Sequence, residues 1–212
     1  GDTVRSEPVV IAVHGGLPDR DHFSIVAGEP NLPISDKGRE GTITAYVFDQ
    51  YANPVPVGTV IYFTTNGGGI EGSAVTNVLG QASVVLITAE PVPEDGKVTV
   101  TARTLGKGGE PLEATTQVRF SGATRVRLIQ PAHFSVMPGE TQTFRFFVGD
   151  ENGNPLAEGT TVTVTAAGGT IIGESSFVLS DTQSPEATQF AINFQADDEG
   201  VTPQMIIEVN SL

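Results

Sequence analysis

Short runs of alternating apolar and polar residues follow one another along the chain, separated by turn-forming residues. TVIYFTT (59–65) and TTVTVTA (160–166), for example, show the two-residue period of a half-buried β-strand. There is no sustained apolar spacing of three and four residues, so we expect no long helix. The pattern predicts strands at 24–27, 41–48, 57–65, 73–78, 81–88, 97–104, 113–121, 125–130, 141–149, 160–166, 174–180, 187–195 and 203–210.

The second half of the chain repeats the first with an offset of 101 residues. Residues 49–72 align with 150–173 without a gap and share ten identities over 24 positions. A repeat of this length indicates a tandem of domains rather than a solenoid. We therefore expect an N-terminal extension with one strand at 1–22, a first domain at 23–122 and a second domain at 123–212.

The repeated residues are ones that shape turns. The Asn-Pro pairs at 53–54 and 154–155 each follow an acidic residue. Pro presets φ and Asn hydrogen-bonds its own backbone, so each pair predicts a tight turn. Gly58 and Gly159 are expected to take a backbone angle that other residues avoid, at the entry to the next strand.

The acidic loops raise the question of calcium. DENGN (150–154) has a superficial likeness to a calcium-binding loop, but the twelfth position of such a loop is Thr161 rather than an acid. Its counterpart DQYAN (49–53) lacks the acidic ligands. PEDG (93–96) and ADDEG (196–200) are predicted to be solvated turns, with weak surface calcium as the alternative. No cofactor is predicted, and none of the three histidines has metal-site spacing with another.

The sequence resembles a known family where these features combine. The first copy contains, in this order, an acidic residue, an NGNPV-like turn, a Gly, a T-V-x-F-T strand and a Gly pair. It continues with GQASVVL (80–86) and GKVTVTA (96–102). This combination resembles bacterial Ig-like domains of the invasin/intimin type (group 1). The resemblance covers nearly all of the first copy and the second copy to about Gly173, after which SPEATQFAINF (184–194) replaces GQASVVL. It implies seven-stranded β-sandwiches with a spacer or adhesive role outside a bacterial cell.

The fold class we predict is all-β, with two tandem immunoglobulin-like β-sandwiches, the second lacking its last strand. Gly96 and Gly200 both open the penultimate strand. Twenty-five residues follow Gly96 up to Ser121 (121 − 96), and twelve follow Gly200 up to Leu212 (212 − 200). The deficit of 13 residues equals about one turn and one strand. PVVIAV (8–13) has the composition of a buried strand but belongs to neither copy.

A sandwich without its final strand exposes core side chains and unpaired backbone groups. The linker at 14–21 reaches at most about 28 Å, less than a domain length of roughly 40 Å, so we do not expect a chain to fill its own groove. We expect head-to-tail donation of residues 4–13 into the second domain of another copy, which builds a filament. The predicted interface residues are Val9, Val10, Ile11, Ala12, Val13, Ile206, Ile207 and Val209.

Two other interpretations of PVVIAV remain open. It can be the last strand of an upstream copy in a longer surface protein, in which case the chain is a stalk or spacer segment and its partners are neighbouring domains. It can also be an extra edge strand on the first sandwich. The size of the oligomer separates donation from the stalk, because a stalk segment is a monomer.

Composition excludes several function classes. The formal net charge is −14, so the surface repels phosphate backbones and anionic membranes, and we expect no nucleic-acid partner. No apolar run approaches the ~20 residues of a membrane span, so no membrane insertion is expected. There is no Cys, and no catalytic motif occurs in its proper context, so we predict no enzyme.

A carbohydrate-binding module is a further alternative, although the chain has no Trp and only three Tyr for sugar stacking. Tyr51, in a predicted turn, is the candidate platform. The function we predict is that of a structural protein located outside the cell, at the bacterial cell surface.

Overall fold

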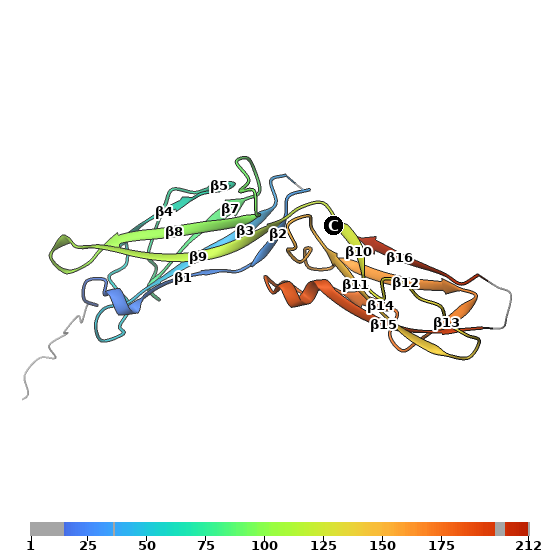
Figure 1. The fold of residues 1–212 in the computed structure, drawn as a ribbon. Coiled ribbons are helices and arrows are strands. Elements are labelled where there is room, and N and C mark those ends of the chain that lie inside the picture. The colour runs from blue at the N-terminus through green and yellow to red at the C-terminus, as the bar shows by residue number, and fades with distance from the viewer. Residues whose placement is uncertain (1–14, 36, 198–201, 212) are drawn as a thin grey trace, which may run out of the picture.

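The computed structural model describes residues 15–35, 37–197 and 202–211, which form two β-sandwiches placed end to end (Figure 1). We refer to them as domain 1 and domain 2. The helices in this described part are three short 3-10 turns, η1 (Arg20–His22), η2 (Lys107–Gly109) and η3 (Pro185–Thr188). None of the helices described here is long and apolar enough to cross a membrane. The predicted donor strand, residues 8–13, lies outside the described residues.

Domain 1 consists of two facing sheets. The first has the order β1-β3-β7-β5 and the second the order β2-β9-β8-β4-β6. All pairs are antiparallel except β2 and β9, which run parallel. The strands of the first sheet are β1 (Phe23–Ala27), β3 (Glu40–Val47), β7 (Gln81–Ile87) and β5 (Gly69–Ile70). Those of the second are β2 (Asn31–Pro33), β9 (Pro111–Ser121), β8 (Lys97–Leu105), β4 (Val60–Thr65) and β6 (Ser73–Val75).

The core of domain 1 follows from the alternating pattern. Along β8, Val98, Val100 and Ala102 are completely buried while the residues between them are not. Successive side chains of a strand point to opposite faces, so one face of each sheet packs into the core. β9 closes this core with Leu112, Val118 and Phe120, and β1 lies against it.

Domain 2 has the same two layers with fewer strands. One sheet has the order β10-β11-β15-β13 and the other the order β14-β12-β16. Their bounds are β10 (Arg125–Gln130), β11 (Thr141–Gly149), β15 (Gln189–Ala196), β13 (Gly169–Ile172), β14 (Ser176–Val178), β12 (Thr161–Ala167) and β16 (Gln204–Asn210). Phe144 and Phe146 of β11 and Ile192 and Phe194 of β15 form the centre of its core.

The predicted all-β tandem sandwich is confirmed, and each strand range predicted between residues 24 and 210 overlaps an observed strand. Gly58 and Gly159 have φ of 89° and 79°, in the left-handed region expected for them. The structure adds three short strands that were not predicted, β2, β5 and β13. They have two to four residues each, too few for an alternating pattern to be recognised.

Candidate assembly site

The edge of β16 distinguishes the two domains. The pairing register makes β12 and β16 the counterparts of β4 and β8, because Val164 lies opposite Ile207 as Phe63 lies opposite Ala102. β8 has two neighbours, β4 and β9. Among the described residues, β16 pairs only with β12. One row of its backbone N–H and C=O groups therefore has no strand beside it in this part of the chain.

The inner face of β16 is correspondingly less covered than that of β8. Met205, Ile207 and Val209 pack against the core of domain 2 but are only half-buried. The residues at the same register positions in β8, Val100, Ala102 and Thr104, are all buried. Burial of each large apolar side chain is worth about 1.5–3 kcal/mol, so this face leaves stabilisation unrealised.

The first strand of domain 2 is uncovered in the same way. Val126 and Leu128 of β10 are 44% and 46% exposed, whereas their counterparts Phe23 and Ile25 of β1 are 8% and 7% exposed. In domain 1, β9 lies against β1 and covers these positions. The described part of domain 2 has no strand in that place, so both side chains stay exposed although they share the core face of the sheet with Val148 and Phe146 opposite them.

The segment after β10 has also lost a pairing partner. In domain 1 the three residues of β2 pair with β9. The counterparts at 132–134, offset by 101 residues, form no strand. Phe134 is 52% exposed and packs edge-on against Phe144, with ring centroids 4.9 Å apart. A small hollow beside it reaches Met205.

These observations outline one apolar strip, which we name the open groove: Val126, Leu128, Phe134, Met205, Ile207 and Val209. Two of the predicted interface residues, Ile207 and Val209, belong to it. Ile206 points to the opposite face of the sheet and is 62% exposed. Met205 completes the inner face and was not predicted, although the alternation with 207 and 209 could have indicated it. The predicted interface with another chain remains a prediction.

A second feature is the contact between the domains, which we name the joint. Asn31 of β2 is buried there, and its side-chain amide donates to the main-chain carbonyls of Pro155, Leu156 and Thr182 at 2.8, 3.2 and 3.3 Å. Its main-chain N–H donates to Asp181 Oδ1 at 2.9 Å. The amide thus satisfies buried carbonyls that would otherwise have no partner.

The joint is extended by three more amides. Gln183 Nε2 donates to the carbonyls of Pro30 and Gln117 at 3.1 and 2.6 Å. Asn152 Nδ2 and Asn154 Nδ2 donate to the carbonyls of Glu94 and Asp95 at 2.8 and 3.0 Å. The connection between the domains passes along this contact, where Gly122 N–H donates to Asp150 Oδ2 at 3.0 Å. Both domains are therefore held by hydrogen bonds from several loops.

Asp181 is a carboxylate of the joint's polar network, where it accepts from the N–H of Asn31. Partial burial raises its pKa, the N–H of Asn31 lowers it, and the negative charges of Glu158 and Glu29 raise it further. The net direction is upward, so the ionised form is disfavoured at this position.

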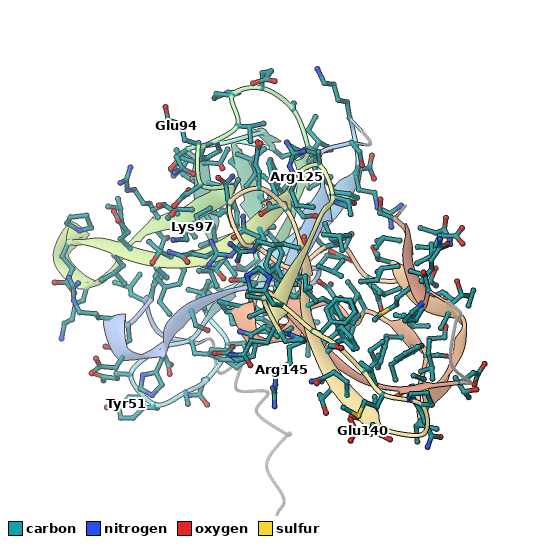
Figure 2. The ribbon with its side chains drawn as sticks, turned by 45° about the vertical axis from the view of Figure 1, so that its right-hand side comes forward. Tyr51, Glu94, Lys97, Arg125, Glu140 and Arg145 are labelled. Carbon is teal, nitrogen blue, oxygen red and sulfur yellow. The ribbon has the colours of Figure 1, made fainter. Side chains whose placement is uncertain are left out.

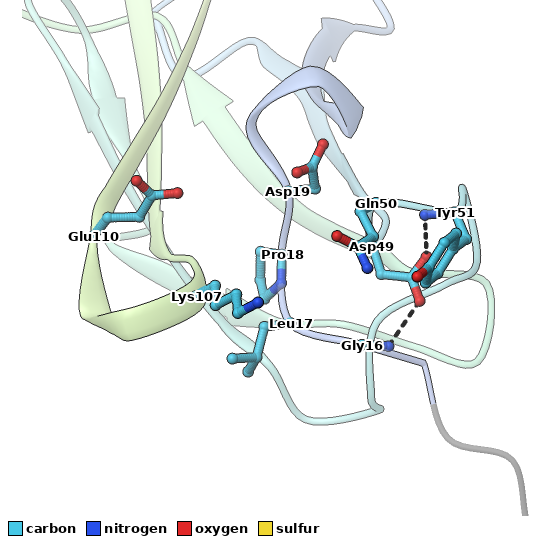
Figure 3. A pocket seen from close by; sticks show the side chains of 9 residues that line it. All are labelled: Gly16, Leu17, Pro18, Asp19, Asp49, Gln50, Tyr51, Lys107 and Glu110. Carbon is cyan, nitrogen blue, oxygen red and sulfur yellow. Dashed lines mark hydrogen bonds between the residues drawn. The ribbon is translucent and has the colours of Figure 1, made fainter.

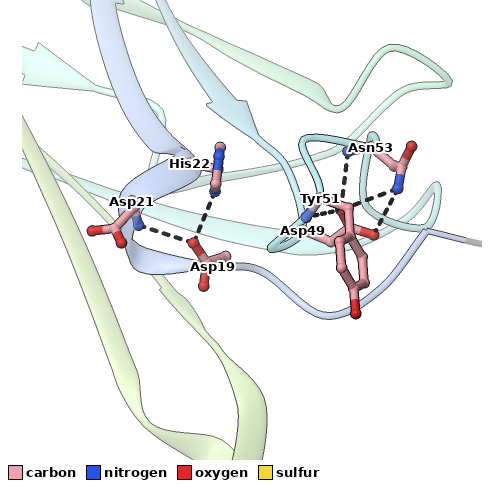
Figure 4. Close-up of polar contacts among 6 residues, drawn as sticks. All are labelled: Asp19, Asp21, His22, Asp49, Tyr51 and Asn53. Carbon is pink, nitrogen blue, oxygen red and sulfur yellow. Dashed lines mark hydrogen bonds and ion pairs between the residues drawn. The ribbon is translucent and has the colours of Figure 1, made fainter.

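Asp49 organises the Asn-Pro turn of domain 1 (Figure 4). Its Oδ1 accepts from the N–H groups of Tyr51 and Asn53, both at 2.9 Å, and its Oδ2 accepts from Gly16 N–H at 2.8 Å. These donors, that of Gly16 first, lower the pKa of Asp49 to about 2. Asp150 repeats the pattern with Asn152 and Asn154, so the DENGN segment is a hydrogen-bonded turn. The described residues contain no group of three or more His, Asp or Glu placed to hold a metal ion.

Comparison with known proteins found similar solved structures. No family model and no curated protein matches this sequence. The chain is similar to the D0–D1 domain of intimin, with 19% identity, 89% of each chain covered and a TM-score of 0.39. It is also similar to FdeC, an Escherichia coli adhesin, with 16% identity, 93% of this chain and 62% of that chain covered, and a TM-score of 0.48.

A third similar structure is that of invasin, a bacterial integrin-binding protein, with 18% identity and a TM-score of 0.41. The match covers 94% of this chain and 38% of invasin, so this chain spans slightly less than two thirds of FdeC and well under half of invasin. The two-sandwich architecture agrees with the Ig-like fold that the sequence motifs imply.

Proposed function

We propose that this chain is a non-enzymatic structural protein of the bacterial surface whose second sandwich is completed by a strand from another copy. The observation that carries the proposal is the open groove, because β9 covers every corresponding position in domain 1. The donated strand is residues 4–13, and repeated donation builds a head-to-tail filament.

The direction of the strands supports donation. β9 runs antiparallel to β8 and toward the joint, where Ser121 and Gly122 lead into the next domain. A strand in the open groove that runs antiparallel to β16 ends at the outer end of domain 2. The chain that supplied it could then continue directly into its own domain 1.

The position of Gly16 supports donation to another chain rather than to the same one. Gly16 is hydrogen-bonded to Asp49 at the end of domain 1 that is opposite the joint (Figure 1). All of domain 1 therefore separates it from the open groove. We therefore propose that residues 4–13 enter the open groove of another copy rather than that of their own chain.

Light scattering of the purified chain tests the proposal. The intact chain should form species larger than a monomer, and a chain that starts at Gly15 should be a folded monomer. A peptide of residues 4–13 should bind the shortened chain, whereas a peptide of the same composition in scrambled order should not. If the shortened chain still assembles, donation is wrong.

The strand itself offers a matched pair of variants for the groove. Ile207→Asn places an amide in the open groove and should abolish assembly. Ile206→Asn makes the same change one residue away on the exposed face and should leave assembly intact. Circular dichroism shows whether the Ile207→Asn chain remains folded. If it does not, binding of the 4–13 peptide to the chain that starts at Gly15 still tests strand donation.

A second candidate function is that of a spacer segment within a longer surface protein, with its partners in the neighbouring domains. The joint favours it, because several hydrogen bonds fix one domain to the other. A monomer at every concentration supports this candidate against donation. A sugar-binding role would require affinity on a glycan array that is lost in Tyr51→Ala, and Tyr51 is 75% exposed.

A further inference from the structure

The Asn-Pro turn occurs once in each domain, but only one copy is covered. In domain 2 the turn lies in the joint, where Asn154 is 6% exposed and Pro155 is buried. The counterparts in domain 1, Asn53 and Pro54, are exposed among the described residues. Domain 1 therefore presents, at its outer end, the same turn that domain 2 places in the joint, with Asn53 at the position of Asn154 and Tyr51 at the position of Asn152.

In both domains a glycine N–H that precedes the first strand donates to the aspartate of the Asn-Pro turn. Gly122 N–H donates to Asp150 Oδ2 at 3.0 Å, and Gly16 N–H donates to Asp49 Oδ2 at 2.8 Å. A Cβ on either glycine would lie against the carboxylate, 3.7 Å away from Asp150 Oδ2 and 3.1 Å away from Asp49 Oδ2. In domain 2 the residues just before this glycine are the end of β9, the last strand of the preceding sandwich. Gly16 holds the same position relative to domain 1 as Gly122 holds relative to domain 2.

The surface around Asp49 is concave and has room for a partner (Figure 3). Leu17, Tyr51, Lys107 and Glu110 border a cavity of about 270 Å³ next to this turn. Leu17 and Tyr51 are both largely exposed. Tyr51 occupies the position of Asn152, whose amide reaches the loop before β8 in the joint. Figure 2 shows that Tyr51 and Glu140 lie at opposite ends of the molecule.

We propose that the Asp49 turn, residues 49–54, is a docking surface for the outer end of domain 2 of another copy. The two chains then meet end to end, as the two domains do at the joint, but without the Asn31 contacts, because Ala132 stands at the position of Asn31 in domain 2. The occupant is a second copy because domain 2 has the fold of domain 1 and presents the corresponding end to solvent, so one contact geometry repeats along the assembly. The inference deepens the proposed function and rests on it, since both require head-to-tail contact.

Crosslinking between two singly substituted chains tests this contact, and the natural chain has no Cys to interfere. One chain carries Tyr51→Cys and the other Asp197→Cys, an exposed position at the outer end of domain 2. A short bismaleimide should join the two chains into a species of twice the monomer mass. A mixture of Tyr62→Cys with Asp197→Cys should give no such species, because Tyr62 is exposed on β4, away from the turn. Tyr51→Cys alone should not form a crosslinked dimer.

The outcomes separate this inference from the proposed function. If the chain assembles and Ile207→Asn abolishes assembly, but residues 51 and 197 do not crosslink, strand donation stands and the docking surface is wrong. If the 62–197 pair crosslinks as well as the 51–197 pair, the contact is not at the Asp49 turn. If the unmodified chain is a monomer at all concentrations, both proposals are wrong.

Discussion

Removing the Asn31 side-chain amide should release the two domains from one another. In Asn31→Ala the carbonyls of Pro155 and Leu156 lose donors at 2.8 and 3.2 Å, and the carbonyl of Thr182 loses one at 3.3 Å. Leaving a buried acceptor without a partner costs about 1–3 kcal/mol. Water can reach these carbonyls only when the joint opens, so this cost favours the open joint. We expect its population relative to the closed one to rise by about 5- to 150-fold.

Single-molecule energy transfer measures this change directly. Dyes attached to Cys at positions 62 and 178, one exposed site in each domain, should give one narrow distance distribution for the natural sequence and a broader one for Asn31→Ala. Gln117→Ala is the matched control, because Gln117 contributes its main-chain carbonyl to the joint and its side chain is exposed. An unchanged distribution in Asn31→Ala would show that the amide does not hold the joint closed.

Three further changes test other parts of the structure. Asp49→Asn removes a carboxylate whose pKa is lowered to about 2, chiefly by the N–H of Gly16. The ionised carboxylate stabilises the folded chain above about pH 4, and this contribution is lost as the pH falls toward about 2. Across that pH range the thermal midpoint should therefore fall less in the variant than in the natural chain. Asp181→Asn keeps a hydrogen-bond acceptor but removes a carboxylate whose pKa is raised, chiefly by burial. Because the ionised carboxylate destabilises the folded chain at neutral pH, the thermal midpoint of the variant should be higher there. A lower midpoint would contradict the direction of the pKa shift. Leu112→Ala, at a completely buried position, should lower the free energy of unfolding in urea by about 2–5 kcal/mol. Ile207→Ala should lower it less, because Ile207 is only half-buried. Equal losses in the two variants would be evidence against an open groove.

The strands could be predicted because their determinants are local. Alternation along TVIYFTT and TTVTVTA, and glycines at the entry of each strand, are visible within a few residues. The open edge could also be predicted, because the repeat indicates that β9 has no counterpart among the described residues of domain 2. The inner and outer faces of β16 were not separated, since Ile206 and Ile207 are equally apolar and only the packing places Ile207 inward.

The joint could not be predicted from the sequence. Asn31 lies 124 to 151 residues from its partners, which are main-chain carbonyls that any residue provides. Nothing in the pattern around Asn31 distinguishes a buried donor from a solvated one. Its strand, β2, has three residues and depends on β9 for its only pairing, so both its existence and its role follow from tertiary contacts.

The chemistry of the joint suits a chain of this charge. With a net charge of −14, contacts that brought further carboxylates together would add repulsion. Four ion pairs are found among the described residues, three within domain 1 and one within domain 2, and none of them crosses the joint. The side-chain donors across it are instead neutral amides of Asn and Gln, and they donate to main-chain carbonyls. These amides and carbonyls add no charge at the place where Asp181 already faces the negative charges of Glu158 and Glu29, so they hold two acidic domains together without increasing that repulsion.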